Sequence, residues 1–281
     1  MTASGTDKFC FDFRQTETGE IKFQCSRDKM KWPWLHLPPA HNAAIQYTNY
    51  YATMGVSAFT NTVSDSAWSA LTEFEYQVGE GGVGDLARHP VRGVARQEQD
   101  TFGFDCDFFD EDDRLVYCVK GKGVVFRNRD FKAWRAPAKA EVLKLPLAEN
   151  FDRARVDAVG ARLPIEVLVE PIQEDGERVV PIGTFVQALV TKAEGFQPVH
   201  PYHDGSGDHV NSAHLFDSAQ QMAFMTVGPQ LPVGGGAKFM RYVELDRPFR
   251  IELTQRNGAR IDFSIKQADK PCVQLYFIYQ D

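Results

Sequence analysis

Residues 209–227 read HVNSAHLFDSAQQMAFMTV, a stretch without glycine or proline. Such a stretch predicts one long helix that begins near His209 and ends near Val227. The glycine run 234–236 that follows predicts a flexible loop. Three strand-like runs then finish the chain: 239–253, 259–267 and 272–279, with an Asn-Gly turn at 257–258. The second half therefore predicts a helix followed by an antiparallel sheet.

The first half of the chain repeats this order of elements. Residues 40–59 have few helix breakers and predict a largely buried helix. A hairpin is expected before each helix: one spans 9–26 with a Thr-Gly turn, and the other spans 165–193 with an Asp-Gly turn at 175–176. Strand-like runs follow the first helix at 70–78, 91–99, 101–109 and 115–126, and the acidic residues 110–113 between the last two predict a solvated turn.

The length of the chain fits two units. Its 281 residues exceed an ordinary single domain and match two units of about 140 residues. The stretch between the two sets of strands is rich in Ala, Arg, Lys and Pro, and a short helix is expected at 148–159. We therefore expect an N-terminal unit at 1–135, a linker at 136–164 and a C-terminal unit at 165–281.

Charge and composition exclude several classes of function. The net charge is −7 and no Lys/Arg cluster interrupts the acidic balance, so nucleic-acid binding is not expected. The chain contains neither a signal-peptide pattern nor an apolar run long enough to span a membrane, which predicts a cytoplasmic protein. Its five cysteines are odd in number and lack CxxC pairs, so we expect reduced thiols.

The densest group of chemically active side chains lies at 198–217. Four of the seven histidines fall between His200 and His214, and aspartates and an asparagine lie among them. The backbone N–H groups in the first turn of a helix lack intrahelical partners, so they can stabilise negative charge on a thioester oxygen. This stretch is the predicted active site.

The order of a hairpin, a long helix and an antiparallel sheet resembles the hot-dog superfamily, in which the sheet curls round one central helix. The resemblance covers nearly the whole chain and implies an α+β tandem, or double, hot-dog fold. It also implies a substrate, because members of this superfamily act on acyl thioesters of coenzyme A or of acyl carrier protein. No cofactor is implied.

The run 207–212 resembles the Asp-x-x-Gly-His-Val-Asn-Asn loop of acyl thioesterases, with one extra residue. By this resemblance Asp204 or Asp208 activates water, His209 assists, and Asn211 holds the water or the carbonyl. Gln220 or Gln221 would bind the water further along the helix. Hydrolysis of an acyl thioester is the function that the sequence favours.

The same stretch also resembles the R-specific enoyl-CoA hydratases of the MaoC type, again with one surplus residue. Tyr202, Ser206, Gly207 and Asp208 match the first part of that motif. His214 matches its end. This resemblance implies that Asp208 and His214 form an acid/base pair that adds water across a double bond, or removes it.

Other interpretations of the stretch remain open. It could be a solvated loop in which Asp208 or Ser206 caps the helix. A metal site built from His200, His203, Asp204 and His209 has no specific ligand spacing, so no metal is predicted.

Outside the stretch, His41 and Asn42 are a weaker second candidate because no carboxylate lies beside them. A non-enzymatic protein that binds or transfers acyl groups is the third class of function, and the chain is expected to be a monomer or a homodimer.

Overall fold

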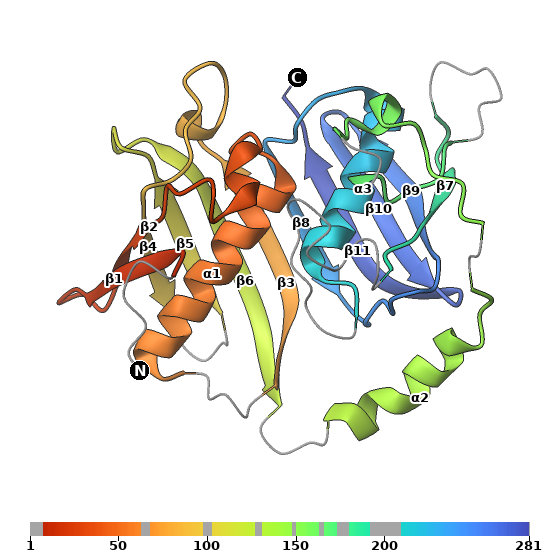
Figure 1. Cartoon of the computed structure of the whole chain (residues 1–281), viewed down its shortest axis with the longest axis horizontal. Coiled ribbons are helices and arrows are strands. Elements are labelled where there is room, and N and C mark those ends of the chain that lie inside the picture. Colours follow the sequence, from red (N-terminus) through yellow and green to blue (C-terminus); the bar gives the residue numbers. More distant parts are fainter. Residues whose placement is uncertain are drawn as a thin grey trace. The chain divides into compact units, whose positions relative to one another are not determined.

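A computed structural model describes residues 8–62, 68–97, 103–126, 131–147, 150–162, 166–172, 180–191 and 209–280. The chain divides into two compact units (Figure 1). The first comprises residues 1–129 and 233–236, and the second comprises residues 130–232 and 237–281.

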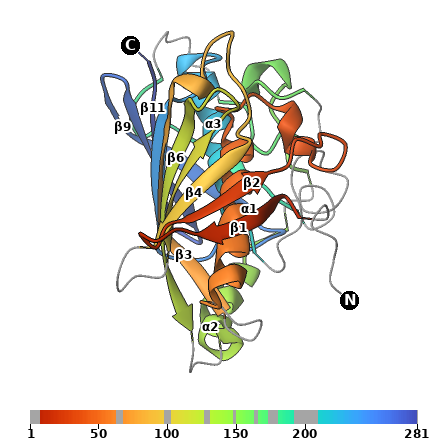
Figure 2. The same ribbon diagram turned by 90° about the vertical axis from the view of Figure 1, so that its left-hand side faces the viewer.

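The first unit is an antiparallel sheet with one long helix, α1 (Asn42–Thr60), against it (Figure 2). Its strands run in the spatial order β1-β2-β4-β5-β6-β3. Their bounds are β1 (Cys10–Gln15), β2 (Ile21–Cys25), β3 (Trp68–Val78), β4 (Arg92–Gln97), β5 (Phe104–Phe109) and β6 (Leu115–Phe126). Short 3-10 helices lie at Pro33–His36 and Glu80–Gly82.

Side chains alternate in this sheet as the sequence pattern predicts. In β2, Ile21, Phe23 and Cys25 are buried and the two residues between them are exposed. A strand exposes successive side chains on opposite faces, so one face of the sheet forms the core. The helix lies on that face. It contacts β1 and β4, and the whole of its first two turns is buried.

A cluster of aromatic rings packs between α1 and the segments that precede it in the chain. The rings of Trp34 and Tyr51 stack with centroids 5.3 Å apart, and Tyr47 stacks on the same indole at 5.2 Å. Phe9 and Trp32 meet edge to face at 5.5 Å. Aromatic pairs at these separations add to the free energy that burial supplies, so this cluster fixes the position of α1 in the first unit.

The second unit has the same kind of construction. Its helix α3 (Ser212–Val227) lies along a face of a sheet whose strands run in the order β11-β10-β9-β7 (Figure 1). Strand β8 is divided between the units, with 234–236 in the first and 237–239 in the second. The strand bounds are β7 (Phe185–Ala188), β8 (Gly234–Phe239), β9 (Phe249–Asn257), β10 (Arg260–Gln267) and β11 (Lys270–Ile278). A further helix, α2 (Phe131–Leu143), precedes them, and a 3-10 turn lies at Asp157–Val159.

The structure corrects three local expectations. The glycine run 234–236 belongs to a buried strand and not to a flexible loop. The expected strand 239–253 begins only at Phe249, after a loop in which Asp246 has a positive φ of 60° and Pro248 follows. The helix expected at 148–159 is found at Phe131–Leu143, where an alanine-rich sequence tolerates an internal proline.

The strands expected around 175–176 are described only in part. Residues 173–179 lie outside the described residues, Val169 makes an isolated bridge to Ala188, and β7 covers part of the second expected run. The two long helices and the remaining strands lie within a few residues of their predicted bounds.

His89 is a titratable group inside the first unit. Its Nε2 lies 2.9 Å from the carbonyl oxygen of Leu37. Burial of the ring lowers the pKa of His89 from 6.5 to about 4, and the hydrogen bond to Leu37 offsets only part of that effect. The ring is therefore neutral at pH 7, and its Nε2–H donates to the carbonyl.

We expect His89 to make the stability of the chain depend on pH. The folded state binds the proton more weakly than the unfolded state, so the contribution is complete above pH 6.5 and is lost as the pH falls toward 4. The shift corresponds to at most about 3 kcal/mol. Urea unfolding between pH 7.5 and 4 should show a steeper loss of stability in the wild type than in His89→Gln. Equal losses would contradict this assignment.

Candidate active site at the start of helix α3

Asn211 begins helix α3. Its backbone is extended, with φ −79° and ψ 167°, and its Oδ1 accepts a hydrogen bond from the backbone N–H of His214 at 3.0 Å. This is the standard N-cap interaction, which satisfies one of the unpaired N–H groups of the first turn. The helix cap is thus Asn211, and not Asp208 or Ser206 as the capping interpretation supposed.

The same oxygen orients the ring of His214. Nδ1 of His214 lies 2.7 Å from Asn211 Oδ1. Because the backbone N–H also points at this atom, it must be the oxygen of the amide and can only accept. Nδ1 therefore carries a proton, so Nε2 is the ring nitrogen that can gain or lose a proton. His214 is fully buried, with 0% of its surface exposed. The arrangement holds the tautomer that a general base requires.

Helix α3 buries five polar side chains, as α1 does. Those of His214, Asp217, Ser218, Gln220 and Gln221 are all buried. Burying polar groups costs free energy unless they are paired, so such a series needs a reason. Asp217 lies one helical turn after His214, a spacing that places two side chains next to each other on the helix surface. It is a buried carboxyl group that the family motifs did not single out.

Gln221 anchors α3 to the segment that precedes the second sheet. Its Oε1 accepts from the backbone N–H of Leu168 at 2.8 Å, and its Nε2 donates to the carbonyl oxygen of Glu166 at 2.7 Å. The amide thus satisfies backbone groups as a neighbouring strand would. The site role expected for Gln220 and Gln221 stays a prediction, but this contact gives Gln221 a structural function.

His209 lies just before the cap. Its ring meets that of Tyr242 edge to face, with centroids 4.6 Å apart. The next residue, Val210, donates its N–H to the carbonyl oxygen of Val243 at 2.8 Å. The segment entering α3 is therefore held by the loop between β8 and β9.

The other predicted site residues lie outside the described residues. They are Tyr202, Asp204, Ser206, Gly207 and Asp208, together with the histidines of the alternative metal site, His200 and His203. Among the residues that the structure describes, no three His, Cys, Asp or Glu side chains gather closely enough to hold a metal ion. The structure brings His209, Asn211 and His214 together at one helix start.

The first unit offers weaker candidates. His41 caps α1, accepting from the N–H of Ala43 at Nδ1 at 3.2 Å, and Asn42 is buried in the first turn. The sequence analysis missed His89, because no cluster of polar residues surrounds it. Its strongly lowered pKa is of a kind that often occurs at functional sites.

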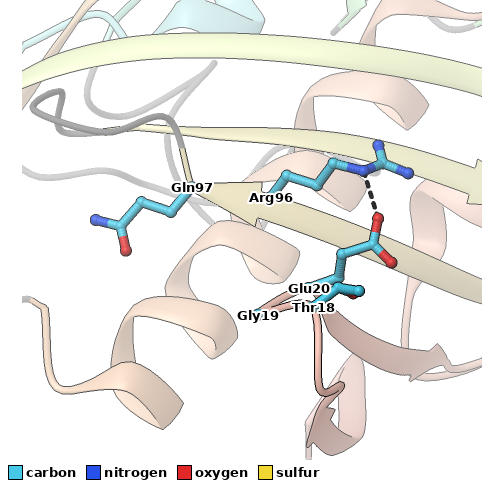
Figure 3. A pocket seen from close by; sticks show the side chains of 5 residues that line it. All are labelled: Thr18, Gly19, Glu20, Arg96 and Gln97. Atoms are coloured by element: carbon cyan, nitrogen blue, oxygen red, sulfur yellow. Dashed lines mark hydrogen bonds and ion pairs between the residues drawn. The ribbon is translucent and has the colours of Figure 1, made fainter.

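The first unit also has a shallow hollow, which is a poor candidate for an active site (Figure 3). It lies between the β1–β2 turn and the end of β4, and it is lined by Thr18, Gly19, Glu20, Arg96 and Gln97. The guanidinium of Arg96 is already paired with Glu20 at 2.7 Å and with Asp107 at 2.6 Å. None of the predicted site residues lines this hollow.

Comparison with known proteins identifies the fold. No family of known sequences matches the chain, and no curated protein matches it. A putative oleoyl thioesterase from Lactobacillus plantarum superposes with a TM-score of 0.51 at 11% identity, covering 85% of this chain and 87% of that one. The dehydratase domain from the terminal module of the rifamycin polyketide synthase superposes with a TM-score of 0.50 at 15% identity, covering 99% and 98%. The chain has a hot-dog fold.

The hot-dog fold predicted from the order of elements is thus confirmed. At these identities the likeness concerns the fold alone, and one of the two structures is a thioesterase while the other is a dehydratase. None of the helices in the described ranges has the length and apolar character needed to cross a membrane.

Proposed function

We propose that this hot-dog protein adds water to, or removes water from, the acyl group of a thioester of coenzyme A or acyl carrier protein. The observation that carries the proposal is the buried ring of His214, whose Nδ1–H is bound by Asn211 so that Nε2 is the nitrogen available for proton transfer. A base held in one tautomer away from water suits abstraction of a weakly acidic proton.

In the dehydration direction, Nε2 of His214 takes a proton from the α carbon of a 3-hydroxyacyl thioester. The electron pair of that C–H bond forms the α,β double bond, and the C–O bond at the β carbon breaks. A carboxylic acid gives its proton to the departing hydroxyl, so water leaves. Hydration reverses each step, with the carboxylate taking a proton from water. No electrons are gained or lost overall.

The carboxylic acid has two candidates. Asp208 corresponds to the aspartate of the hydratase motif, so the resemblance assigns it this role. Asp217 is supported by the structure, since it is buried on α3 one turn from His214. The substitutions Asp208→Asn and Asp217→Asn separate the two, because only the variant that lacks the proton donor loses turnover.

Thioester hydrolysis is the alternative that the sequence favoured. It needs Asn211 to hold the attacking water or the carbonyl group. In the structure, Oδ1 of Asn211 already accepts from both the backbone N–H and Nδ1 of His214. These contacts occupy the acceptor of the Asn211 amide, while its N–H groups can still donate to a carbonyl or to water. The preference for hydration or dehydration therefore rests on the orientation of the His214 ring.

We also propose that the two units are tandem hot dogs, each built on one long helix, α1 or α3. The N-terminal unit would cover 1–135 and the C-terminal unit 165–281, with 136–164 between them. Both helices bury polar side chains, but only α3 places a histidine and a carboxyl group one turn apart, His214 and Asp217, which supports an active site in the second unit.

Two assays on the same substrates test the proposed function. Crotonyl-CoA and its acyl-carrier equivalent should lose the absorbance of the conjugated double bond when protein is added, without release of free thiol. Thiol release with the double bond intact would establish hydrolysis instead. Saturable binding with neither change would leave acyl binding as the function and would refute the proposal.

A further inference from the structure

Helix α2 buries few apolar side chains against the rest of the second unit. Of its residues 132–143, whose exposure the structure describes, only Arg135 and Val142 are buried. Lys139 lies between them on the same side of the helix, at intermediate exposure. Most helices in folded proteins are held by a broad apolar stripe, so α2 depends on something other than hydrophobic burial.

That other contribution is a buried ion pair. Nε of Arg135 lies 3.1 Å from Oε1 of Glu244, and Nη2 lies 2.5 Å from Oε2. The two side chains are only 4% and 5% exposed. The paired geometry of guanidinium and carboxylate fixes both direction and distance, which a single-point contact does not.

The same arginine also covers an aromatic ring. Its guanidinium lies 4.7 Å from the centroid of Tyr242, at the start of the loop that carries Glu244. Tyr242 in turn contacts His209 through its ring, and Val243 accepts the N–H of Val210. The three consecutive residues 242–244 therefore connect the arginine on α2 with the segment that enters α3.

The loop itself is held firmly from the sheet side. Gln267, at the end of β10, accepts the N–H of Glu244 at 2.8 Å and donates to its carbonyl oxygen at 3.0 Å. With the backbone of Glu244 fixed in this way, the position of its carboxylate, and so of Arg135, is fixed relative to the start of α3.

We propose that Arg135 is a positioning residue for the active site at the start of α3. It holds Tyr242 against His209 and so keeps residues 209–211 in the conformation in which Asn211 orients His214. A buried ion pair often contributes more to a unique geometry than to stability, because desolvation of its charges offsets much of their attraction. That the positioned site is catalytic rests on the proposed function.

Hydrogen exchange tests the positioning without relying on activity. In Arg135→Met, amides in a peptide covering 209–215 should exchange at least about 10-fold faster than in the wild type, because that segment then opens locally. A peptide from β10 and β11 should exchange at an unchanged rate. Arg135→Lys keeps a positive charge beside Glu244 but cannot make two parallel hydrogen bonds to the carboxylate. It should give an exchange rate between those of the wild type and Arg135→Met. Lys139 also lies near Glu244, with its Nζ 3.7 Å from Oε2. Because Arg135→Lys keeps a second cation beside this carboxylate, it serves as the test if the methionine variant does not fold.

A control removes another arginine–carboxylate ion pair, one that lies on the surface. Arg155 and Asp157 are 82% and 68% exposed and lie 2.5 Å apart, so Arg155→Met should leave exchange at 209–215 unchanged. On the substrates named above, Arg135→Met should lower kcat at least about 10-fold with a smaller change in KM. Unchanged exchange at 209–215 in both Arg135 variants would overturn the positioning role. Absence of turnover in the wild type would instead refute the proposed function, and the exchange result would stand.

Discussion

Replacing His214 by alanine is expected to lower kcat/KM for hydration of an enoyl thioester by about 10²- to 10⁴-fold, the usual effect of losing a general base. The imidazole is buried and its Nδ1 is bound to Asn211, so alanine removes both the base and the contact that orients it. Absorbance of the conjugated substrate measures the loss, and circular dichroism checks that α3 remains folded.

Ser218→Ala is a matched control for this substitution. Ser218 is also fully buried and lies one turn further along α3, where its Oγ donates to the carbonyl oxygen of His214 at 2.7 Å. Its loss should change kcat/KM by less than about 10-fold, because no ring is displaced. If His214→Ala kept turnover within about threefold of the wild type, His214 would not be the base.

Gln221→Leu is expected to lower the free energy of unfolding of the second unit by about 2–5 kcal/mol. The variant leaves the N–H of Leu168 and the carbonyl of Glu166 without the partners they have in the structure, and each buried group left unsatisfied costs about 1–3 kcal/mol. Urea unfolding measures the change. The shape of leucine is close to that of glutamine, so loss of packing volume contributes little.

Gln230→Leu provides the comparison, since Gln230 is exposed in the loop after α3. It should change the free energy of unfolding by less than about 0.5 kcal/mol. A loss of activity in Gln221→Leu at a temperature where the variant remains folded would show that this side chain also acts on substrate, as the sequence suggested. A loss of stability below about 1 kcal/mol would mean that the two backbone bonds are replaced by water.

The sequence was informative wherever a pattern is local. The breaker-free stretch at 209–227 predicted α3, and alternation at 21–25 predicted β2, because the repeat of 3.6 or 2 residues decides which side chains share a face. The order of these elements was sufficient to predict the hot-dog fold. The concentration of histidines before α3 pointed to the N-terminal end of the helix, and the site there stays a prediction.

Other features depend on contacts in the folded chain and could not be predicted from local sequence patterns. The glycines 234–236 lie in a buried strand, and Arg135 and Glu244 are paired although 109 positions separate them. The most important case is His214. The sequence showed a histidine three residues after an asparagine, and only the folded helix start brings Nδ1 and a backbone N–H onto one oxygen.

Sequence by itself therefore determined the elements and the location of the polar site, because both follow from side-chain chemistry at short range along the chain. The protonation geometry of His214, the anchoring role of Gln221 and the ion pair that connects α2 with the start of α3 were decided by the tertiary structure. Each depends on two buried groups lying at hydrogen-bond distance. A buried polar atom without a partner costs free energy, so the arrangement that pairs these groups is preferred.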